Sequence, residues 1–128
     1  MAYTTINKPT DYFNTKLYTG NGSTNAITGV GFQPDWVSIK RRSGSAANGG
    51  VFDVVRGVTK RIYSSNNSAE STDAQTLTAF GTDGFTLGTN SYINGNSDTF
   101  VSWNWKGAGS TAANSDGDIT STVSANTT

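Results

Sequence analysis

The apolar residues of this chain come in short runs, and most of these runs are bounded by Gly, Asn, Asp or Ser. Helical periodicity is nearly absent. The one helix candidate, residues 69–75, has no large apolar side chain, which favours a loop or a single turn. Short apolar runs between turn residues are typical of β-strands. The sequence therefore predicts an all-β fold.

Strands are expected at residues 14–19, 26–28, 30–32, 36–41, 51–56, 59–64, 76–80, 84–87 and 99–106. The last of these, TFVSWNWK, alternates most clearly, with Val101, Trp103 and Trp105 on one face and Ser102 and Asn104 on the other. Strands of this number and length, without helices, indicate an antiparallel β-sandwich or jelly roll.

The core of such a domain has few residues to draw on. Only 34% of the chain is hydrophobic, and Ser, Thr, Asn and Gly make up about half of it. Aromatic residues account for 11%, and large rings bury much area each. We therefore expect Trp36, Trp103 and Trp105 to lie in the core, with a sugar-stacking platform as the alternative for these rings.

Three segments are expected along the chain. Residues 14–107 form the β-sandwich, and residues 108–128 form a Ser/Thr/Ala-rich linker or tail. Residues 1–13 form an N-terminal arm in which Tyr3, Ile6, Tyr12 and Phe13 are spaced among polar residues. This arm is expected to dock on a neighbouring subunit.

Several function classes are disfavoured. The chain has no His or Cys, and Glu70 is its only glutamate, so common catalytic bases, thiol nucleophiles and soft-metal ligands are missing. We expect no enzyme activity, no metal and no cofactor. The net charge is zero, which disfavours nucleic acid. No apolar run approaches the roughly 20 residues of a membrane helix, and the N-terminus does not resemble a signal peptide.

Two sets of side chains are candidates for surface contacts. Tyr92 and Asn94 lie in a polar segment expected to be a loop tip, and with Trp36 they are candidates for binding glycan or a partner. Arg41, Arg42, Arg56 and Arg61 are the candidates for a basic contact patch. The alternative for these arginines is that they edge a sheet and discourage wrong strand pairing.

Motifs along residues 5–107 give the chain a family resemblance. They are INKPTDYF (6–13), YTGNG (18–22), GFQPDWV (31–37), DVVRGVTK (53–60), DGFTLG (83–88) and VSWNWK (101–106). In this order they resemble a module of marine bacteriophage structural proteins. The resemblance implies a concanavalin-like sandwich, often in tandem copies, in a tail fibre or virion surface protein. It implies no particular binding residues.

Together these observations predict a non-enzymatic bacteriophage structural protein, located in the virion. Its partners would be other virion proteins and itself, as a homo-oligomer, with a trimer as the candidate state. The alternative is a carbohydrate-binding adhesin domain that recognises host-surface glycan.

Overall fold

The computed structural model describes residues 8–44, 46–107, 112–115 and 118–123 of the chain. Its strands are β1 (Phe13–Thr19), β2 (Asn25–Ile27), β3 (Trp36–Arg41), β4 (Gly50–Asp53), β5 (Lys60–Arg61), β6 (Ser71–Thr72), β7 (Leu77–Gly81), β8 (Gly84–Leu87), β9 (Thr99–Trp105), β10 (Ala112–Asn114) and β11 (Ser121–Val123). The described helices are a 3-10 turn, η1 (Pro9–Asp11), and a one-turn α-helix, α1 (Ser91–Asn94).

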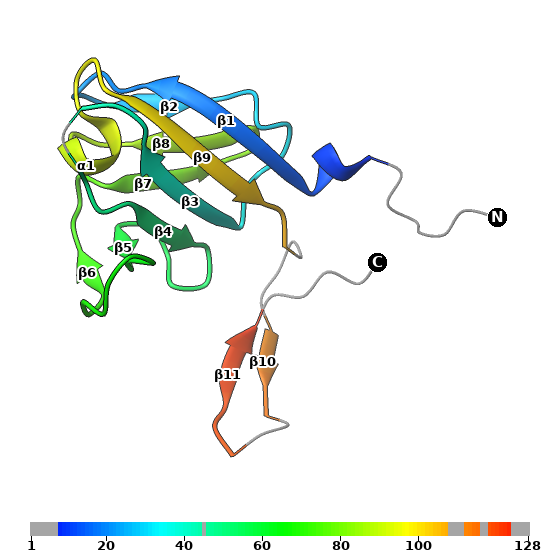
Figure 1. Ribbon diagram of the computed structural model, residues 1–128. Helices are drawn as coiled ribbons and strands as arrows, with labels where there is room; N and C mark the ends of the chain where they lie inside the picture. The colour runs from blue at the N-terminus through cyan, green and yellow to red at the C-terminus, as the bar shows by residue number, and fades with distance from the viewer. Residues whose placement is uncertain (1–7, 45, 108–111, 116–117, 124–128) are drawn as a thin grey trace.

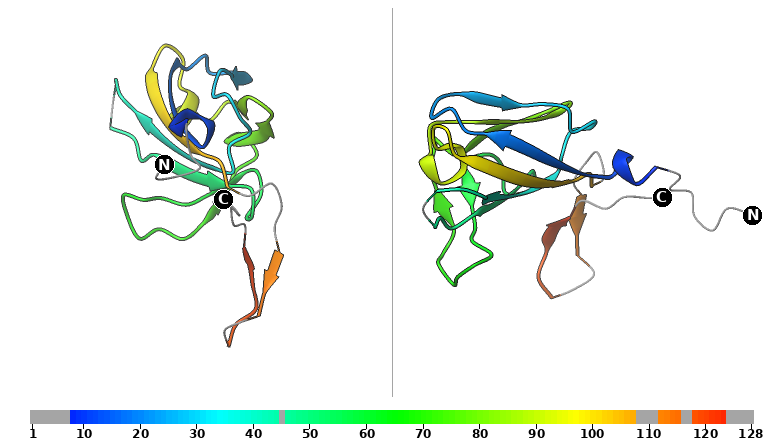
Figure 2. Two further views of the ribbon diagram at one scale, coloured as in Figure 1. Left: turned by 90° about the vertical axis from the view of Figure 1, so that its right-hand side faces the viewer. Right: turned by 45° about the horizontal axis from the view of Figure 1, so that its top comes forward.

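Two antiparallel sheets form the body of the domain. One has the strand order β1-β9-β3-β4 and the other the order β2-β8-β7. They lie as two layers (Figures 1 and 2). Smaller antiparallel pairs are formed by β5 with β6 and by β10 with β11. The predicted all-β, antiparallel β-sandwich is confirmed.

The core lies between the two sheets. Its fully buried members are Ile27, Val37, Ile39, Phe52, Leu77, Phe85, Leu87, Ile93 and Phe100. Tyr18 packs against them, stacked on Phe100 at a centroid distance of 5.2 Å, and its hydroxyl donates to the Ile93 carbonyl at 2.7 Å. Each large side chain therefore comes from a strand position that faces the opposite layer, or from α1.

The inward face of β9 is the opposite of the one expected. Phe100, Ser102 and Asn104 are fully buried. Trp103 and Trp105 are 36% and 41% exposed on the outer face. The predicted period-two alternation is confirmed, but the prediction that these tryptophans lie in the core is wrong. One buried ring, Phe100, supplies this strand's share of the core.

Near the end of β9 the buried side chain of Asn104 binds the backbone of β1, and the side chain of Asn14 in β1 binds the backbone of a loop. Asn104 donates to the Asn14 carbonyl at 3.0 Å, and Asn14 donates to the Val30 carbonyl at 2.8 Å. Residues 30–32, predicted as a strand, form this loop instead, with Val30 and Phe32 buried. Backbone groups outside a sheet need such partners when they are buried.

Asp83 fixes the same loop from the other side. Its carboxylate accepts the N–H groups of Gly29 and Gly31 at 2.8 and 2.7 Å. Both glycines have positive φ, 78° and 93°, a conformation that favours glycine. The two backbone hydrogen bonds, helped by the charge of Lys16, lower the pKa of Asp83 below 3.8.

Within residues 89–96, which were expected to be a loop tip, Ser91–Asn94 form the one-turn helix α1. The Asn90 side chain caps α1 by accepting the Tyr92 N–H. Asn94, at the end of α1, is fully buried. Its amide donates to the carbonyls of Ser23 at 2.6 Å and Gly88 at 2.7 Å, and its oxygen accepts from Asn25 at 2.9 Å.

The segment boundaries differ in detail from those expected. β1 begins at Phe13, which was placed in the arm, and β10 and β11 lie within the predicted linker. Tyr3 and Ile6 lie outside the described residues. The expected strands 51–56 and 59–64 shorten to β4 and β5, which remain joined by an antiparallel bridge between Val51 and Ile62.

Replacing Asn94 by Ala should lower the free energy of unfolding by about 2–4 kcal/mol, because several buried backbone groups lose their partner. Chemical denaturation measures the loss. Asn96→Ala is the matched control, since Asn96 is exposed. Equal stability of the two variants would contradict the stabilising role of the hydrogen bonds that the Asn94 side chain forms with the backbone.

The Tyr18 hydroxyl should make stability fall in alkali. Burial raises the pKa of Tyr18 well above 10.0 in the folded chain. Its contribution is therefore fully present below about pH 10 and is lost as the pH rises towards the folded-state value. In Tyr18→Phe we expect a loss of about 1 kcal/mol at neutral pH and a flatter alkaline decline, measured by denaturation across pH. An unchanged alkaline slope would contradict this assignment.

Candidate functional site

The outer face of the four-stranded sheet carries an exposed aromatic cluster. Strand register places Phe13, Trp105 and Trp36 side by side across β1, β9 and β3. The next row contains Trp103, and the third contains Leu17, which is 57% exposed. We call Phe13, Leu17, Trp36, Trp103 and Trp105 the aromatic face. A contiguous exposed apolar surface of this kind marks an interaction site.

The rings of the aromatic face are not coplanar. Phe13 and Trp105 are 4.6 Å apart with an interplanar angle of 49°, and Trp36 meets Trp105 edge-on at 4.5 Å and 78°. A sugar platform presents ring faces in one plane, whereas this cluster presents edges and faces together. The geometry favours contact with irregular protein surface over stacking on a row of sugar rings.

A pocket of about 280 Å³ deepens one end of this face. Trp36 and Trp105 form part of its wall, and Val54 and Val55 from the turn after β4 form another part. Val55 is 43% exposed. The pocket extends the apolar surface past the edge of β3, so the aromatic face is a ridge beside a hollow rather than a flat plane.

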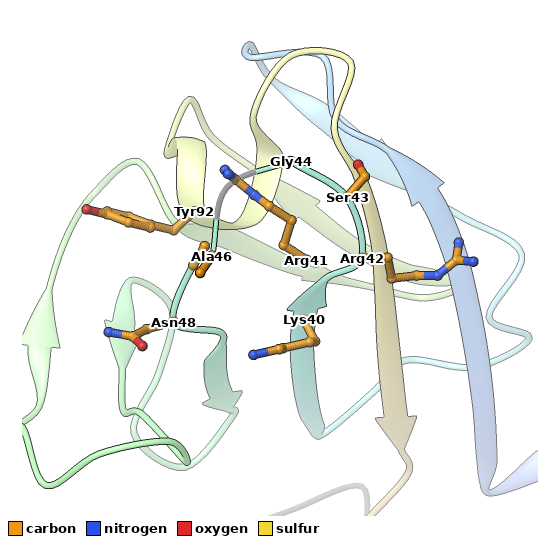
Figure 3. Close-up of a pocket in the computed structure, with 9 residues that line it drawn as sticks. Lys40, Arg41, Arg42, Ser43, Gly44, Ala46, Asn48 and Tyr92 are labelled. Carbon is orange, nitrogen blue, oxygen red and sulfur yellow. The ribbon is translucent and has the colours of Figure 1, made fainter.

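A second concave region lies beyond the opposite end of β3. This loop pocket, about 600 Å³ in volume, is lined by Lys40, Arg41, Arg42, Ser43, Gly44, Ala46, Ala47, Asn48 and Tyr92 (Figure 3). In this view the Arg41 side chain is directed towards α1, and that of Arg42 points away from Tyr92. Tyr92 and Asn48 also belong to the wall of a third pocket.

The third pocket is built around Arg61 of β5. This Arg61 pocket has a volume of about 360 Å³ and is lined by Asn48, Arg61, Tyr63, Asn66, Ser68, Ala69, Ser71 and Tyr92. The Arg61 guanidinium lies over the ring of Tyr63 at 4.6 Å and near that of Tyr92 at 5.7 Å. It also donates to the Tyr63 hydroxyl at 2.5 Å.

Arg61 is unusual because it is buried and has no acidic partner in the described part of the chain. It is 6% exposed, and among the described residues its Nε and Nη1 atoms have no hydrogen-bond partner. The free-energy cost of burying a charged group is roughly several kcal/mol, even after the protein relaxes around it. Two cation–π contacts return about 0.5–2 kcal/mol each. The protein therefore holds a guanidinium whose hydrogen-bonding capacity is only partly used.

The other predicted basic residues have different surroundings. Arg56 pairs with Asp53 at 2.6 Å and Glu70 at 3.1 Å. Arg41 pairs with Asp98 at 3.3 Å and also donates to the Ser91 carbonyl. Arg42 is exposed. The four arginines therefore do not form one open basic patch: two are neutralised by carboxylates and one is buried.

The predicted glycan-binding residues are not brought together. Tyr92 is 50% exposed on α1, as expected for a surface residue. Trp36 belongs to the aromatic face, at the other end of β3. The assignment of Asn94 to the surface is wrong, because its side chain is fully buried and bound to backbone groups.

The described arm residues contact the end of β9. Tyr12 lies under Lys106, whose ammonium is 5.9 Å from the ring centroid, and the Tyr12 carbonyl accepts the Lys106 N–H at 2.8 Å. Phe13 packs on Trp105. These residues therefore belong to the domain itself, and Phe13 contributes to the aromatic face.

Aspartates of the described chain are engaged in local structure. Asp35 accepts the Gly107 N–H at 2.6 Å, and Asp73 accepts the Gln75 N–H at 2.8 Å and the Asn90 amide at 2.7 Å. Within the described ranges, no three acidic, His or Cys side chains are grouped so that they could hold a metal ion.

The sequence analysis gave an exposed surface of Trp36, Trp103 and Trp105 only as the alternative to burial, and it did not single out Arg61. Phe100 stands opposite Trp103 and Trp105 in the alternation of β9, but alternation alone does not show which of the two faces the core uses. No sequence signal singles out Arg61 from its basic neighbours, because its isolation depends on which carboxylates fold next to which arginines.

These features define an all-β sandwich domain with an exposed aromatic face and a buried arginine, beside a polar pocket, that forms no ion pair with the residues that the structure describes. Residues 8–128 match the family described as Domain of unknown function (DUF7483), and the chain belongs to this family. No curated protein and no solved structure matches the chain. In the part of the chain that the structure describes, no helix is long and apolar enough to cross a membrane.

Tryptophan fluorescence should report the outward placement of Trp103 and Trp105. In dilute protein we expect emission at long wavelength and ready quenching by acrylamide, because these rings are partly open to solvent. Strong protection of the tryptophans from acrylamide quenching that persists on dilution would contradict the structure. Protection that disappears on dilution would show instead that another molecule covers the face.

Proposed function

We propose that this chain is a non-catalytic structural module of a bacteriophage particle, in a tail fibre or a virion surface protein, and that it assembles through its aromatic face. The aromatic face, in which Phe13, Leu17, Trp103 and Trp105 are exposed and Trp36 is partly buried, carries the assembly part of the proposal. The motif resemblance described above supports its bacteriophage origin.

The composition of the aromatic face supports protein as its partner. Interface cores are enriched in aromatic residues and depleted of charge. In the two rows that hold the rings on β1, β9 and β3, the other side chains are Thr15 and Ser38, which are uncharged. Lys40 lies one row further, and Asp53, next to Trp36, is already paired with Arg56. The centre of the surface can therefore be covered without desolvating an unpaired charge.

We infer that the partner on this face is another copy of the same chain. The formal net charge is zero, so two copies do not repel each other at long range. An apolar centre with polar edges can also be self-complementary about a symmetry axis. With 34% hydrophobic residues and a small core, burial between copies would add stability that the isolated domain lacks.

The absence of catalysis is part of the proposal. It is supported by the occupied state of the carboxylates: Asp53 and Asp98 pair with arginine, and Asp35, Asp73 and Asp83 bind backbone N–H groups. Carboxylates so engaged serve turns and strand ends rather than a shared substrate.

Trp103→Lys should break the assembly. Because Trp103 lies in the middle row of the aromatic face, a charge there should weaken self-association at least about 30-fold, the effect of losing about 2 kcal/mol at an interface hot spot. Sedimentation velocity over a concentration series measures it. Val58→Lys is the matched control, since Val58 is 40% exposed but lies outside the aromatic face.

The wild-type chain is expected to sediment as an oligomer. The proposal would be overturned if the wild-type chain stayed monomeric at all concentrations and also failed to bind purified bacteriophage particles. A monomer that binds particles through Trp103 would keep the assembly role and replace the second copy by another virion subunit.

Glycan recognition is the second candidate function, and the position of Tyr92 favours it. This ring is half exposed and borders two pockets whose walls also contain amide and hydroxyl side chains. An accessible ring beside hydrogen-bonding groups suits a sugar, whose CH faces stack and whose hydroxyls need partners.

A further inference from the structure

The Arg61 pocket has the features of a site for an anionic ligand. Arg61 is more than nine-tenths buried, lines the pocket, and forms no ion pair among the described residues. Its Nε and Nη1 atoms lack acceptors there. Glu70, which lies in the sequence between the lining residues Ala69 and Ser71, forms an ion pair with Arg56 at 3.1 Å. The positive charge is therefore left for something outside the described protein atoms.

The backbone makes room for this arginine. A Cβ at Gly50 would lie 2.8 Å from the Phe52 ring and 2.9 Å from Arg61 Cδ, closer than side-chain contacts allow, so the glycine of β4 leaves room for both side chains. Tyr63 and Tyr92 lie over the guanidinium. Gly50 thus leaves space for the Arg61 side chain, and the two rings contact its guanidinium beside the pocket.

The rest of the lining indicates what else the ligand carries. Asn48, Asn66, Ser68 and Ser71 supply amide and hydroxyl groups, and none of the described Asp or Glu residues lines the pocket. Tyr92, which is half exposed, adds an aromatic ring to the lining. The volume of about 360 Å³ lies near the lower end of small-molecule pockets, which span about 300–1,000 Å³.

A carboxylate on a sugar ring meets all of these features. A planar carboxylate matches the forked donors of a guanidinium. Ring hydroxyls match the amide and hydroxyl side chains, and the CH face of the ring matches Tyr92. We propose that the Arg61 pocket binds an acidic sugar unit, a uronic or sialic acid, of a polysaccharide. This rests on the second candidate function and names its ligand class; it does not depend on assembly through the aromatic face.

The unpaired Nε and Nη1 atoms are shielded from solvent in the structure described here. Tyr92 is the part of the cover that is half exposed, and it stands on a helix of one turn. Binding therefore includes a displacement of the Tyr92 ring from the guanidinium to the face of the sugar.

The test is a titration of the full chain, followed by amide chemical shifts, with methyl glycosides of glucuronic acid and sialic acid as probes. Methyl glucoside, which differs from the glucuronide only in the carboxylate, is the neutral comparison, and inorganic phosphate tests for a general anion site. We expect an acidic glycoside to shift residues around Asn48 and Tyr92, and to bind at least about tenfold more tightly than glucoside or phosphate, as a charge-assisted pair requires.

Variants locate the effect. Arg61→Gln should weaken binding of the acidic glycoside at least about tenfold, whereas Arg42→Gln, a change at an exposed arginine outside this pocket, should leave it unchanged. Because Arg61 is buried, a loss of binding in Arg61→Gln counts as evidence only if the amide spectrum shows that the variant has the native fold. Tyr92→Ala, an exposed position, gives the independent test and should also weaken binding.

The possible failures are distinct. Equal affinity for glucuronide and glucoside, with loss in Tyr92→Ala, would keep glycan binding and overturn the acidic ligand class. Equal affinity for phosphate and glucuronide, or full affinity in a folded Arg61→Gln variant, would overturn the site as proposed. No binding of any sugar would overturn both the site and the glycan candidate.

Discussion

The pairing of β9 with strands on both sides is the constraint on which the rest of the structure depends. β9 lies between β1 and β3 in antiparallel register, so its backbone is fixed along its whole length. Once Phe100 enters the core, alternation directs Ser102 and Asn104 inward and Trp103 and Trp105 outward. The same register sets Phe13 and Trp36 beside Trp105. One strand thereby determines both the packing of the core and the surface through which we propose the domain assembles.

Buried amides hold the loops that the sheets do not reach. Asn94 ties α1 to the turn after β1 and to the end of β8, and Asn14 and Asn104 serve the loop that ends near Val30. A chain with half of its residues drawn from Ser, Thr, Asn and Gly can bury few apolar groups. Its interior is completed by hydrogen-bonded polar side chains, which tolerate burial only when paired. Arg61 departs from this rule, and that departure is the basis of the proposed acidic-sugar site.

The two proposed surfaces use different chemistry at different ends of β3. The aromatic face is apolar and tilted, which suits another protein surface. The Arg61 pocket is concave, polar and positively charged, which suits a small acidic group. A particle protein that both assembles and contacts polysaccharide would need two such surfaces on separate parts of one rigid sandwich. The two surfaces are separate because the pocket beside the aromatic face and the Arg61 pocket share no lining residue.

The sequence by itself determined the fold class and most strand positions, because short apolar runs and turn residues act locally on the backbone. β3 and β8 follow the predicted bounds, and β9 ends one residue earlier than expected. Tertiary structure alone decided which face of β9 is buried, since alternation gives two faces but does not say which one meets the second sheet. It also decided that residues 30–32 form a loop, that Asn94 is buried, and that Arg56 and Arg41 pair with carboxylates, whereas Arg61 pairs with none among the described residues. Those outcomes depend on contacts between residues far apart in the chain, and no local pattern encodes them.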